Sequence, residues 1–168
     1  MRQTFEKILQ QKFAWTAVRL ALAWTFLWAF LDKTFGLGYA TESANSWLNG
    51  GSPTEGYLSF AASGPLEGFY NSLAGSAAID VLFMATLLLL GVALFLGIGL
   101  RLAAIGGSLL MLLMWSSRLP PENNPLIDDH IVYLFVLVGL ALANAGQWYG
   151  LGKWWANMPL VKRFPILG

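Results

Sequence analysis

The residues best suited to chemistry lie in one polar stretch, residues 115–133, with the sequence WSSRLPPENNPLIDDHIVY. The stretch contains the only histidine of the chain, His130, and three of the nine acidic residues. Because an imidazole gains or loses a proton near neutral pH, we name His130, Asp128 and Arg118 as candidate catalytic residues. Three prolines interrupt the stretch, which predicts a hinge between two helices rather than one continuous helix.

The same residues also admit structural explanations. Asp80 and Asp128 are predicted at helix N-termini, where the helix dipole favours an anion, and His130 could be an ordinary histidine at a helix start. Asp128, Asp129 and His130 are residue types that bind metals, but three consecutive side chains of one helix point in different directions. We therefore expect no metal site.

The composition indicates an integral membrane protein. Hydrophobic residues make up 57% of the 168 residues and charged residues 11%, whereas about a quarter of the residues of a soluble domain are charged. The formal net charge of +1 gives no sign of nucleic-acid binding. Because the chain has no cysteine and one histidine, we exclude iron–sulfur clusters, thioether-linked haem and bis-histidine haem.

Four apolar segments predict an all-α membrane protein, a four-transmembrane-helix bundle formed by a single domain over residues 1–168. The predicted spans cover about residues 13–35, 77–100, 102–117 and 127–148. Lysine and arginine are concentrated on one side of these spans, at Arg2, Lys7, Lys12, Arg101, Lys153, Lys162 and Arg163. Only Lys33 and Arg118 fall on the other side, so the positive-inside rule predicts a multi-pass protein of the cell membrane with both termini cytoplasmic.

Two further segments are predicted outside the bilayer core. Residues 36–76, rich in Gly, Ser and Asn, are expected to form an extracytoplasmic helical cap. Within the cap we expect one short helix over 41–48 and another that begins near Pro65. Residues 1–12 predict an interfacial helix on the inner leaflet, with one apolar face formed by Phe5, Ile8 and Leu9.

The predicted topology brings an ionisable group from every span to the same outer rim. These groups are Asp32, Lys33, Asp80, Arg118, Asp128, Asp129 and His130. An unpaired charge near a low-dielectric boundary costs several kcal/mol, so opposite charges should pair there. We expect Lys33 or Arg118 to pair with one of the aspartates Asp80, Asp128 and Asp129.

An aromatic-lined cavity is expected beneath this rim. Trp28 precedes Asp32 by four residues, and Trp115 precedes Arg118 by three, so each tryptophan shares a helix face with a rim charge. Such a cavity suits a flat amphipathic ligand, including a non-covalently bound quinone head group. The alternative is that both tryptophans are packing or interfacial residues.

Arg19 requires a separate explanation because it lies about two turns inside the inner boundary of the first span. Its side chain should extend towards the interface or meet a buried acceptor, for which Asn144 is the expected neutral partner. We expect Arg19 and Asn144 to be structural, or part of a headgroup site of the inner leaflet.

Several motifs resemble the DoxX family. RLALAWTFLWAFLDK is similar to the family's first helix, GVALFLGIGLRLAA to the end of its second helix, and ENNPLIDDHIVY with AGQWYGLGKWW to its DoxD-like branch. The resemblance covers about residues 13–155 and implies the membrane subunit of a thiosulfate:quinone oxidoreductase. The family positions carried over are Arg19, Lys33, Arg101, Asn123, Asn124, Asp128 and His130.

Three functions remain open at this stage. The first is a quinone-linked oxidoreductase subunit that acts at the outer rim, either alone or with a second redox subunit. The second is a non-catalytic membrane anchor or assembly partner that holds an extracytoplasmic redox protein through the cap. The third is a small transporter or lipid-binding protein. We expect the lipid bilayer and a quinone as partners, expect no nucleic acid, and consider a homodimer compatible with the abundant small residues.

Overall fold

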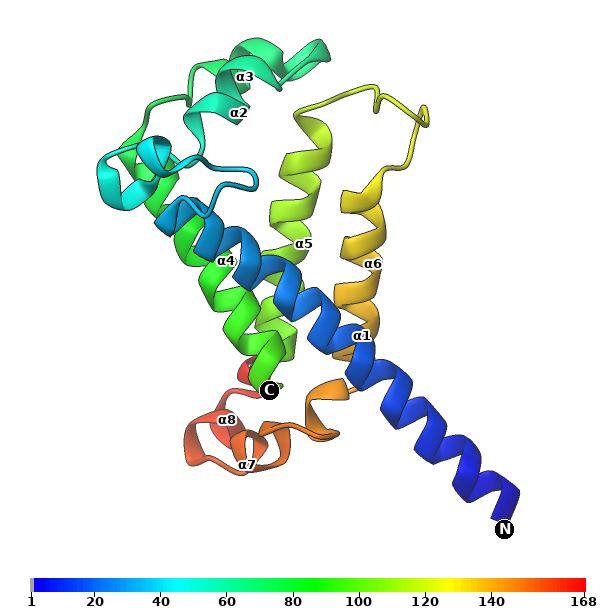
Figure 1. Cartoon of the computed structure of the whole chain (residues 1–168). Helices are drawn as coiled ribbons and strands as arrows, with labels where there is room; N and C mark the ends of the chain where they lie inside the picture. The colour runs from blue at the N-terminus through cyan, green and yellow to red at the C-terminus, as the bar shows by residue number, and fades with distance from the viewer. Residues whose placement is uncertain (1) are drawn as a thin grey trace.

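A computed structural model describes residues 2–168, with side chains from Glu6 onward. These residues form helices and connecting loops without a β-strand, so the all-α prediction is confirmed for the described part of the chain. The four longest helices are α1 (Arg2–Phe35), α4 (Ala77–Leu96), α5 (Leu100–Ser116) and α6 (Asp129–Leu142). Figure 1 shows them side by side, with the cap at one end and the C-terminal helices at the other.

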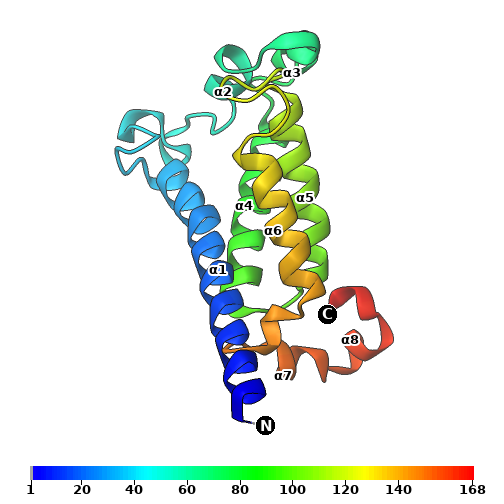
Figure 2. The same cartoon turned by 90° about the vertical axis from the view of Figure 1, so that its right-hand side faces the viewer.

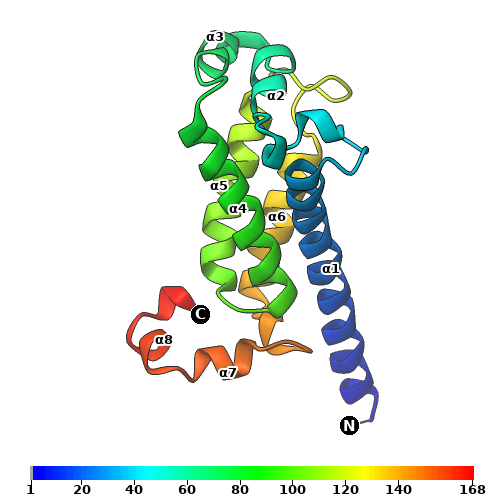
Figure 3. The same ribbon diagram turned by 60° about the vertical axis from the view of Figure 1, so that its left-hand side comes forward.

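The four helices pack in pairs around one apolar core. α1 runs along α4, and α5 runs along α6, as Figure 2 shows; Figure 3 shows α4 from the front, with α5 and α6 behind it. The core is built from large apolar side chains of all four helices, including Leu22, Phe26, Met84, Leu94, Met111, Leu137 and Leu140. Gly91 allows α1 and α4 to approach closely, since a Cβ atom at this position would lie 2.6 Å from Leu27 Cγ.

Two helices are long and apolar enough to cross a membrane: Glu6–Phe35 within α1, and α4. Only 28% and 33% of the residues in their apolar windows are buried, so about two thirds or more of each window is at least partly exposed. A soluble monomer rarely exposes large continuous apolar patches. The structure therefore associates this chain with a membrane.

The predicted interfacial helix over residues 1–12 is not a separate element. α1 is continuous from Arg2 to Phe35, because the polar N-terminal stretch contains good helix formers and neither proline nor glycine. The side chain of Phe5, named in that prediction, lies outside the described residues. At a rise of about 1.5 Å per residue, α1 is about 51 Å long, and its N-terminal part extends beyond the other helices (Figure 2).

The last long helix is shorter than predicted. A span over 127–148 was expected, but α6 has 14 residues and ends at Leu142. Asn144 adopts a positive φ of 49° and begins the 3₁₀ turn η4 (Ala145–Gln147), so the chain leaves the helix before the predicted end. The second and third helices also differ slightly from prediction, because Gly97 and Gly99 form the turn between α4 and α5.

The cap consists of five short helical segments. They are η1 (Ser43–Asn45), η2 (Trp47–Asn49), α2 (Glu55–Phe60), η3 (Gly64–Leu66) and α3 (Glu67–Asn71). The helix expected over 41–48 is thus a pair of 3₁₀ turns, and α2 was not predicted. Leu58, Ala62 and Tyr70 form a small buried cluster in the cap, which packs against Ile79 of α4.

The C-terminal residues form a platform across the end of the bundle opposite the cap (Figure 2). This platform consists of α7 (Gly152–Ala156), α8 (Pro159–Arg163) and η5 (Pro165–Leu167). Arg101 Nη1 donates a hydrogen bond to Pro165 O at 2.8 Å and so fastens the platform to the start of α5.

Candidate functional site

Two of the predicted rim carboxylates hold the cap in place. Asp80 is buried and accepts hydrogen bonds from Ser52 Oγ at 2.9 Å, Thr54 N at 3.1 Å and Thr54 Oγ1 at 2.6 Å. Asp32, which is 1% exposed, accepts from the backbone N–H groups of Tyr39 and Ala40 at 3.3 and 3.0 Å. Both carboxylates therefore hold backbone N–H or hydroxyl groups of the cap through charge-assisted hydrogen bonds, which are stronger than hydrogen bonds between neutral groups.

Lys33 lies between these two carboxylates but bonds to neither. Its Nζ atom donates to Pro53 O at 3.1 Å and lies 6.0 Å from the centre of the Phe83 ring. Asp32 and Asp80 both attract the ammonium group electrostatically. Within the described part of the chain no ion pair joins Lys33 to an acid, so the predicted pairing is wrong. Both oxygens of Asp32 and Oδ1 of Asp80 accept hydrogen bonds from cap groups, and Lys33 bonds a carbonyl instead.

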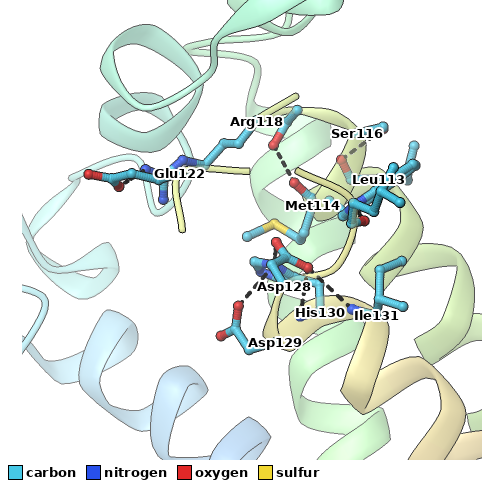
Figure 4. A network of polar contacts seen from close by, with 12 residues as sticks. Leu113, Met114, Ser116, Arg118, Glu122, Asp128, Asp129, His130 and Ile131 are labelled. Atoms are coloured by element: carbon cyan, nitrogen blue, oxygen red, sulfur yellow. Dashed lines mark hydrogen bonds and ion pairs between the residues drawn. The ribbon is translucent and has the colours of Figure 1, made fainter. Parts of the chain in front are cut away.

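Arg118 also pairs differently from the prediction. Its guanidinium contacts Glu122 at 3.5 Å, and both side chains are solvent-exposed. Figure 4 shows the Arg118 side chain extending towards Glu122 and away from Asp128 and His130. The backbone N–H of Ser63 in the cap bonds to Ser117 O, so the hinge is held in a position that favours the local, four-residue pair.

Asp128 and His130 form a close pair at the start of α6. Asp128 Oδ1 accepts from the backbone N–H groups of His130 and Ile131 and so caps the helix, while Asp128 Oδ2 lies 2.8 Å from His130 Nδ1. Burial alone would raise the pKa of Asp128, but these hydrogen bonds outweigh it and hold that pKa below its ordinary value. The carboxylate orients the imidazole, which leaves Nε2 as the second proton-exchanging atom.

The prediction that the side chains of Asp128, Asp129 and His130 point in different directions is wrong. Ligand atoms of Asp128, Asp129 and His130 lie within 4.8 Å of one another, since Asp128 precedes the helix and is not part of its spiral. His130 Nδ1 lies 3.5 Å from Asp129 Oδ1 as well as close to Asp128. The imidazole nitrogen that faces the carboxylates is therefore occupied by hydrogen bonding.

The two tryptophans expected to line a cavity have other contacts. Trp28 packs against Trp24 and Tyr39, with ring centres 5.6 and 5.0 Å apart. Trp115 Nε1 donates to Leu126 O at 3.0 Å and so holds the hinge loop. Neither tryptophan lines either of the two cavities described below, because one ring packs on the cap and the other on the hinge.

The two hinge asparagines carried over from the family have different surroundings. Asn124 Oδ1 accepts hydrogen bonds from the backbone N–H groups of Leu126 and Ile127, at 2.9 and 3.1 Å. This contact shapes the turn that leads into α6. Asn123 is exposed to solvent. The structure therefore gives Asn124 a local backbone role, and neither asparagine lines either of the two cavities described below.

A cavity lies under the cap, between α4 and α5. Its volume is about 440 Å³, within the range of small-molecule sites. The wall is mainly apolar: Leu58, Phe69, Leu73, Ile79, Leu82, Phe83, Leu109, Leu110, Leu113 and Met114. Lys33 is the only residue of the predicted site that lines this cavity. Leu82 and Leu109 are 64% and 59% exposed, so the cavity reaches the outer surface of the bundle.

Polar atoms gather on the cap side of this cavity. The Tyr57 hydroxyl bonds to Ser117 Oγ at 2.8 Å, and the Tyr70 hydroxyl bonds to Ser116 Oγ at 2.6 Å. Burial raises the pKa of Tyr57, so its phenol stays protonated and able to donate. The cavity thus has one cation and a phenol at one end and hydrocarbon side chains elsewhere.

Sequence reasoning missed this cavity because its walls come from α1, α4, α5 and the cap, which are far apart in the sequence. The apolar residues of the cap predicted that it packs on another surface, but they did not predict a cavity between the two. Gly106 of α5 is the one local signal, since a Cβ atom at this position would meet nothing within 4 Å. A glycine in a helix interior costs about 1 kcal/mol relative to alanine, so an unfilled position next to it hints at a cavity.

Arg19 is fully buried and bonds to backbone carbonyls, not to the predicted Asn144. Its Nη1 atom donates to Leu94 O and, at 2.9 Å, to Phe95 O in the last turn of α4. Its Nη2 atom donates to Trp148 O and Tyr149 O at 3.4 and 3.2 Å. The predicted partner is wrong because Asn144, which is exposed, turns the chain out of α6 and thereby frees the carbonyls that Arg19 meets.

The loop that Arg19 binds is packed against the α4–α5 turn. A Cβ atom on Gly146 would lie 2.2 Å from Gly97 O, which only glycine can tolerate. The cation also lies at the C-terminal end of α4, where the helix dipole favours positive charge. Arg19 is therefore a structural group that joins α1, α4 and the loop after α6.

Comparisons with family models, with curated proteins and with solved structures found no match. The resemblance to the DoxX family stays a prediction that depends on the motifs quoted above.

Proposed function

We propose that the chain is a four-span membrane protein that binds a quinone under its cap and acts as the membrane subunit of a quinone-linked oxidoreductase. The membrane part of the proposal is supported by the outward apolar faces of all four long helices. α5 and α6 expose Ile105, Leu109, Val132 and Phe135, as α1 and α4 expose Phe13 and Leu89. In water these side chains would form a continuous apolar surface.

The length of α6, the shortest of the four long helices, is compatible with four membrane spans. α4 is about 30 Å long and matches a bilayer core, whereas α6 is about 21 Å long. The residues that complete the fourth crossing, 143–149, are non-helical over part of their length. Irregular backbone is tolerated at membrane depth where other protein groups form hydrogen bonds with it. Arg19 donates such hydrogen bonds to the carbonyl oxygens of Trp148 and Tyr149.

Charge asymmetry supports a cytoplasmic position for both termini. Of the nine acidic residues, all except Glu6 lie at the cap end of the bundle. The platform end carries Lys7, Lys12, Arg101, Lys153, Lys162 and Arg163. The positive-inside rule therefore directs the cap to the extracytoplasmic side.

The cavity under the cap supports the quinone proposal more than any other observation. A quinone has a flat ring with two carbonyl acceptors and a long apolar tail. Lys33 Nζ uses one of its three hydrogens on Pro53 O, which leaves donors for a ring carbonyl. The tail would leave between Leu82 and Leu109, where the cavity reaches the surface that faces the lipid.

The protons and electrons of the proposed reaction have separate sources. Reduction of a quinone to a quinol takes up two electrons and two protons. The Asp128–His130 pair is the proposed source of protons from the outer surface, and Asp128 is near enough to help raise the pKa of Tyr57 in the cavity wall. Electrons would come from a sulfur compound such as thiosulfate, since two thiosulfate ions release two electrons when they join as tetrathionate.

We assign the oxidation of the sulfur compound to a partner subunit. The chain has no cysteine to react with sulfur. The excess of acidic residues at the cap end also opposes the approach of a dianion such as thiosulfate. In this proposal the chain binds and protonates the quinone, and the partner delivers the electrons at the cap.

A leucine that fills the cavity tests this proposal directly. Gly106→Leu places a side chain in open space in the cavity wall, so the bundle should fold normally while the cavity loses volume. We expect quinone that copurifies with the wild-type protein in mild detergent, and at least a ten-fold weaker affinity for added short-chain quinone in the variant. Both are measured by extraction and by quenching of tryptophan fluorescence.

Gly68→Leu is the matched control, because this glycine also has open space around it but does not line the cavity. It should bind quinone as the wild type does. Equal quinone affinity in the Gly106→Leu and Gly68→Leu variants would remove the cavity from the proposal. A wild-type protein that neither retains nor binds quinone would remove the quinone.

A second function, a non-catalytic anchor for an extracytoplasmic redox protein, is favoured by the exposed surface of the cap. Phe60 is 89% exposed, and Tyr39 and Leu48 are also largely exposed. These apolar groups lie among acidic residues of the cap, which together suit a partner with a basic rim. Copurification of a stoichiometric partner that Phe60→Ser abolishes, with no quinone bound to either, would favour this function.

A further inference from the structure

We infer that the platform end of the molecule contains a binding site for the phosphate group of an anionic phospholipid. The site is a cavity of about 230 Å³ between the ends of α5 and α6 and the C-terminal platform. Its polar side chains are Arg101, Lys162, Asn144 and Gln147. No carboxylate side chain of the described residues lines it. Two cations and two amides without an acidic side chain suit a phosphate group.

The two cations are held on separate elements that face the cavity. Arg101 is anchored by its contact with Pro165 O, which uses one of its five N–H donors and leaves others for an anion. Lys162 lies in α8, and its side chain is exposed. The backbone N–H of Arg101 is already bonded to Gly168 O, so side chains supply the charge of this site.

The platform around the cavity has the composition of a membrane-interface segment. Trp154, Leu160 and Phe164 are 58%, 57% and 47% exposed, although they belong to short helices at the end of a bundle. Lys153 and Arg163 are exposed beside them, and Arg163 lies over the Phe164 ring at 5.4 Å. Tryptophan and basic residues at one level are typical of the boundary between headgroups and hydrocarbon.

The position of the cavity selects a lipid rather than a soluble anion. In Figure 2 the platform lies next to the start of α5 and the end of α6. A phospholipid whose chains run along the apolar outer faces of α5 and α6 would bring its phosphate to the level of Arg101 and Lys162. This inference uses the membrane orientation proposed above, but it does not depend on the bound quinone.

The test compares thermal stabilisation of the full-length protein in detergent by phosphatidylglycerol, by phosphatidylcholine and by inorganic phosphate. We expect saturable stabilisation by phosphatidylglycerol that exceeds the effect of phosphatidylcholine, and little effect of inorganic phosphate. Lys162→Gln should weaken the apparent affinity for phosphatidylglycerol about five-fold, the effect of removing one basic residue near an anionic surface. Lys162 makes no side-chain hydrogen bond in the described structure, so this variant should fold.

Lys7→Gln is the matched control, because Lys7 lies at the same end of the molecule but does not line the cavity. It should retain the wild-type affinity for phosphatidylglycerol. The inference is overturned if Lys162→Gln and Lys7→Gln weaken binding equally, since the effect would then be one of general charge. It is also overturned if phosphatidylcholine or inorganic phosphate stabilises the protein as well as phosphatidylglycerol does.

Native mass spectrometry of the wild-type protein gives a readout that needs no variant. The protein is taken from a mixture of phosphatidylglycerol and phosphatidylcholine. Bound lipid that is enriched in phosphatidylglycerol supports the site, and bound lipid with the same composition as the mixture contradicts it. Quinone binding is read independently through the Gly106→Leu variant, so failure of one proposal is distinguishable from failure of the other.

Discussion

Replacement of Arg19 by methionine should destabilise the fold more than any other single loss of charge. The side chain is fully buried and supplies hydrogen bonds to four carbonyl oxygens, two in the last turn of α4 and two in the loop after α6. Methionine has a similar length and apolar volume but no donor. All four carbonyls would lose this donor in a place that water does not readily reach.

The magnitude follows from the geometry of the four contacts. A hydrogen bond to a charged group contributes about 1.5–3 kcal/mol, and the contacts with Trp148 O and Tyr149 O are longer than those with α4. Full weight for the two α4 contacts and little for the other two gives a loss of about 3–6 kcal/mol. For a domain of this size each kcal/mol shifts the melting temperature by about 2–4 °C, so the expected fall is about 6–24 °C.

The measurement is thermal unfolding in detergent followed by tryptophan fluorescence, with an SDS titration to obtain the free energy of unfolding. Arg118→Met is the matched control, since it removes an exposed arginine whose ion pair with Glu122 contributes about 0–1 kcal/mol. Arg19→Lys should fall between, because a compact ammonium cannot span carbonyls on two elements as a guanidinium does. If Arg19→Met melts within about 2 °C of Arg118→Met, the carbonyls are satisfied by other groups and the structural role assigned to Arg19 is wrong.

Two further outcomes are expected. Lys33→Met should lower the affinity for added quinone about ten-fold, the cost of one hydrogen bond to a charged group, and an unchanged quinone titration would contradict the placement of the ring beside Lys33. Asp128→Ala should lower the free energy of unfolding by about 1 kcal/mol at neutral pH through loss of the α6 cap. Because the folded-state pKa of Asp128 lies below its ordinary value, this difference is present above about pH 3.9 and should disappear as the pH falls through the folded-state pKa; a difference that persists at lower pH would show that the carboxylate charge has no part in it.

The sequence by itself determined the helical class, the positions of the long helices and the two ends of different charge. These properties are local, because the length of an apolar run and the positions of proline and glycine determine where each helix begins and ends. The hinge between α5 and α6 and the cap of α6 by Asp128 follow from Pro120, Pro121 and the residues next to them. The continuous α1 could also have been predicted, since residues 2–13 contain no helix breaker.

Only the tertiary structure decided which groups the charges meet. Asp80 and Lys33 are at the same end of the bundle, as expected, but the folded cap brings Thr54 to the carboxylate and Pro53 O to the ammonium. Arg19 was recognised as a buried cation, yet its partners are backbone carbonyls at the end of α4 and in the loop that follows α6. Backbone acceptors carry no sequence signal, because every residue has one. The cavity was missed for a related reason: its walls come from α1, α4, α5 and a cap of five short segments, and only their packing leaves the space between them.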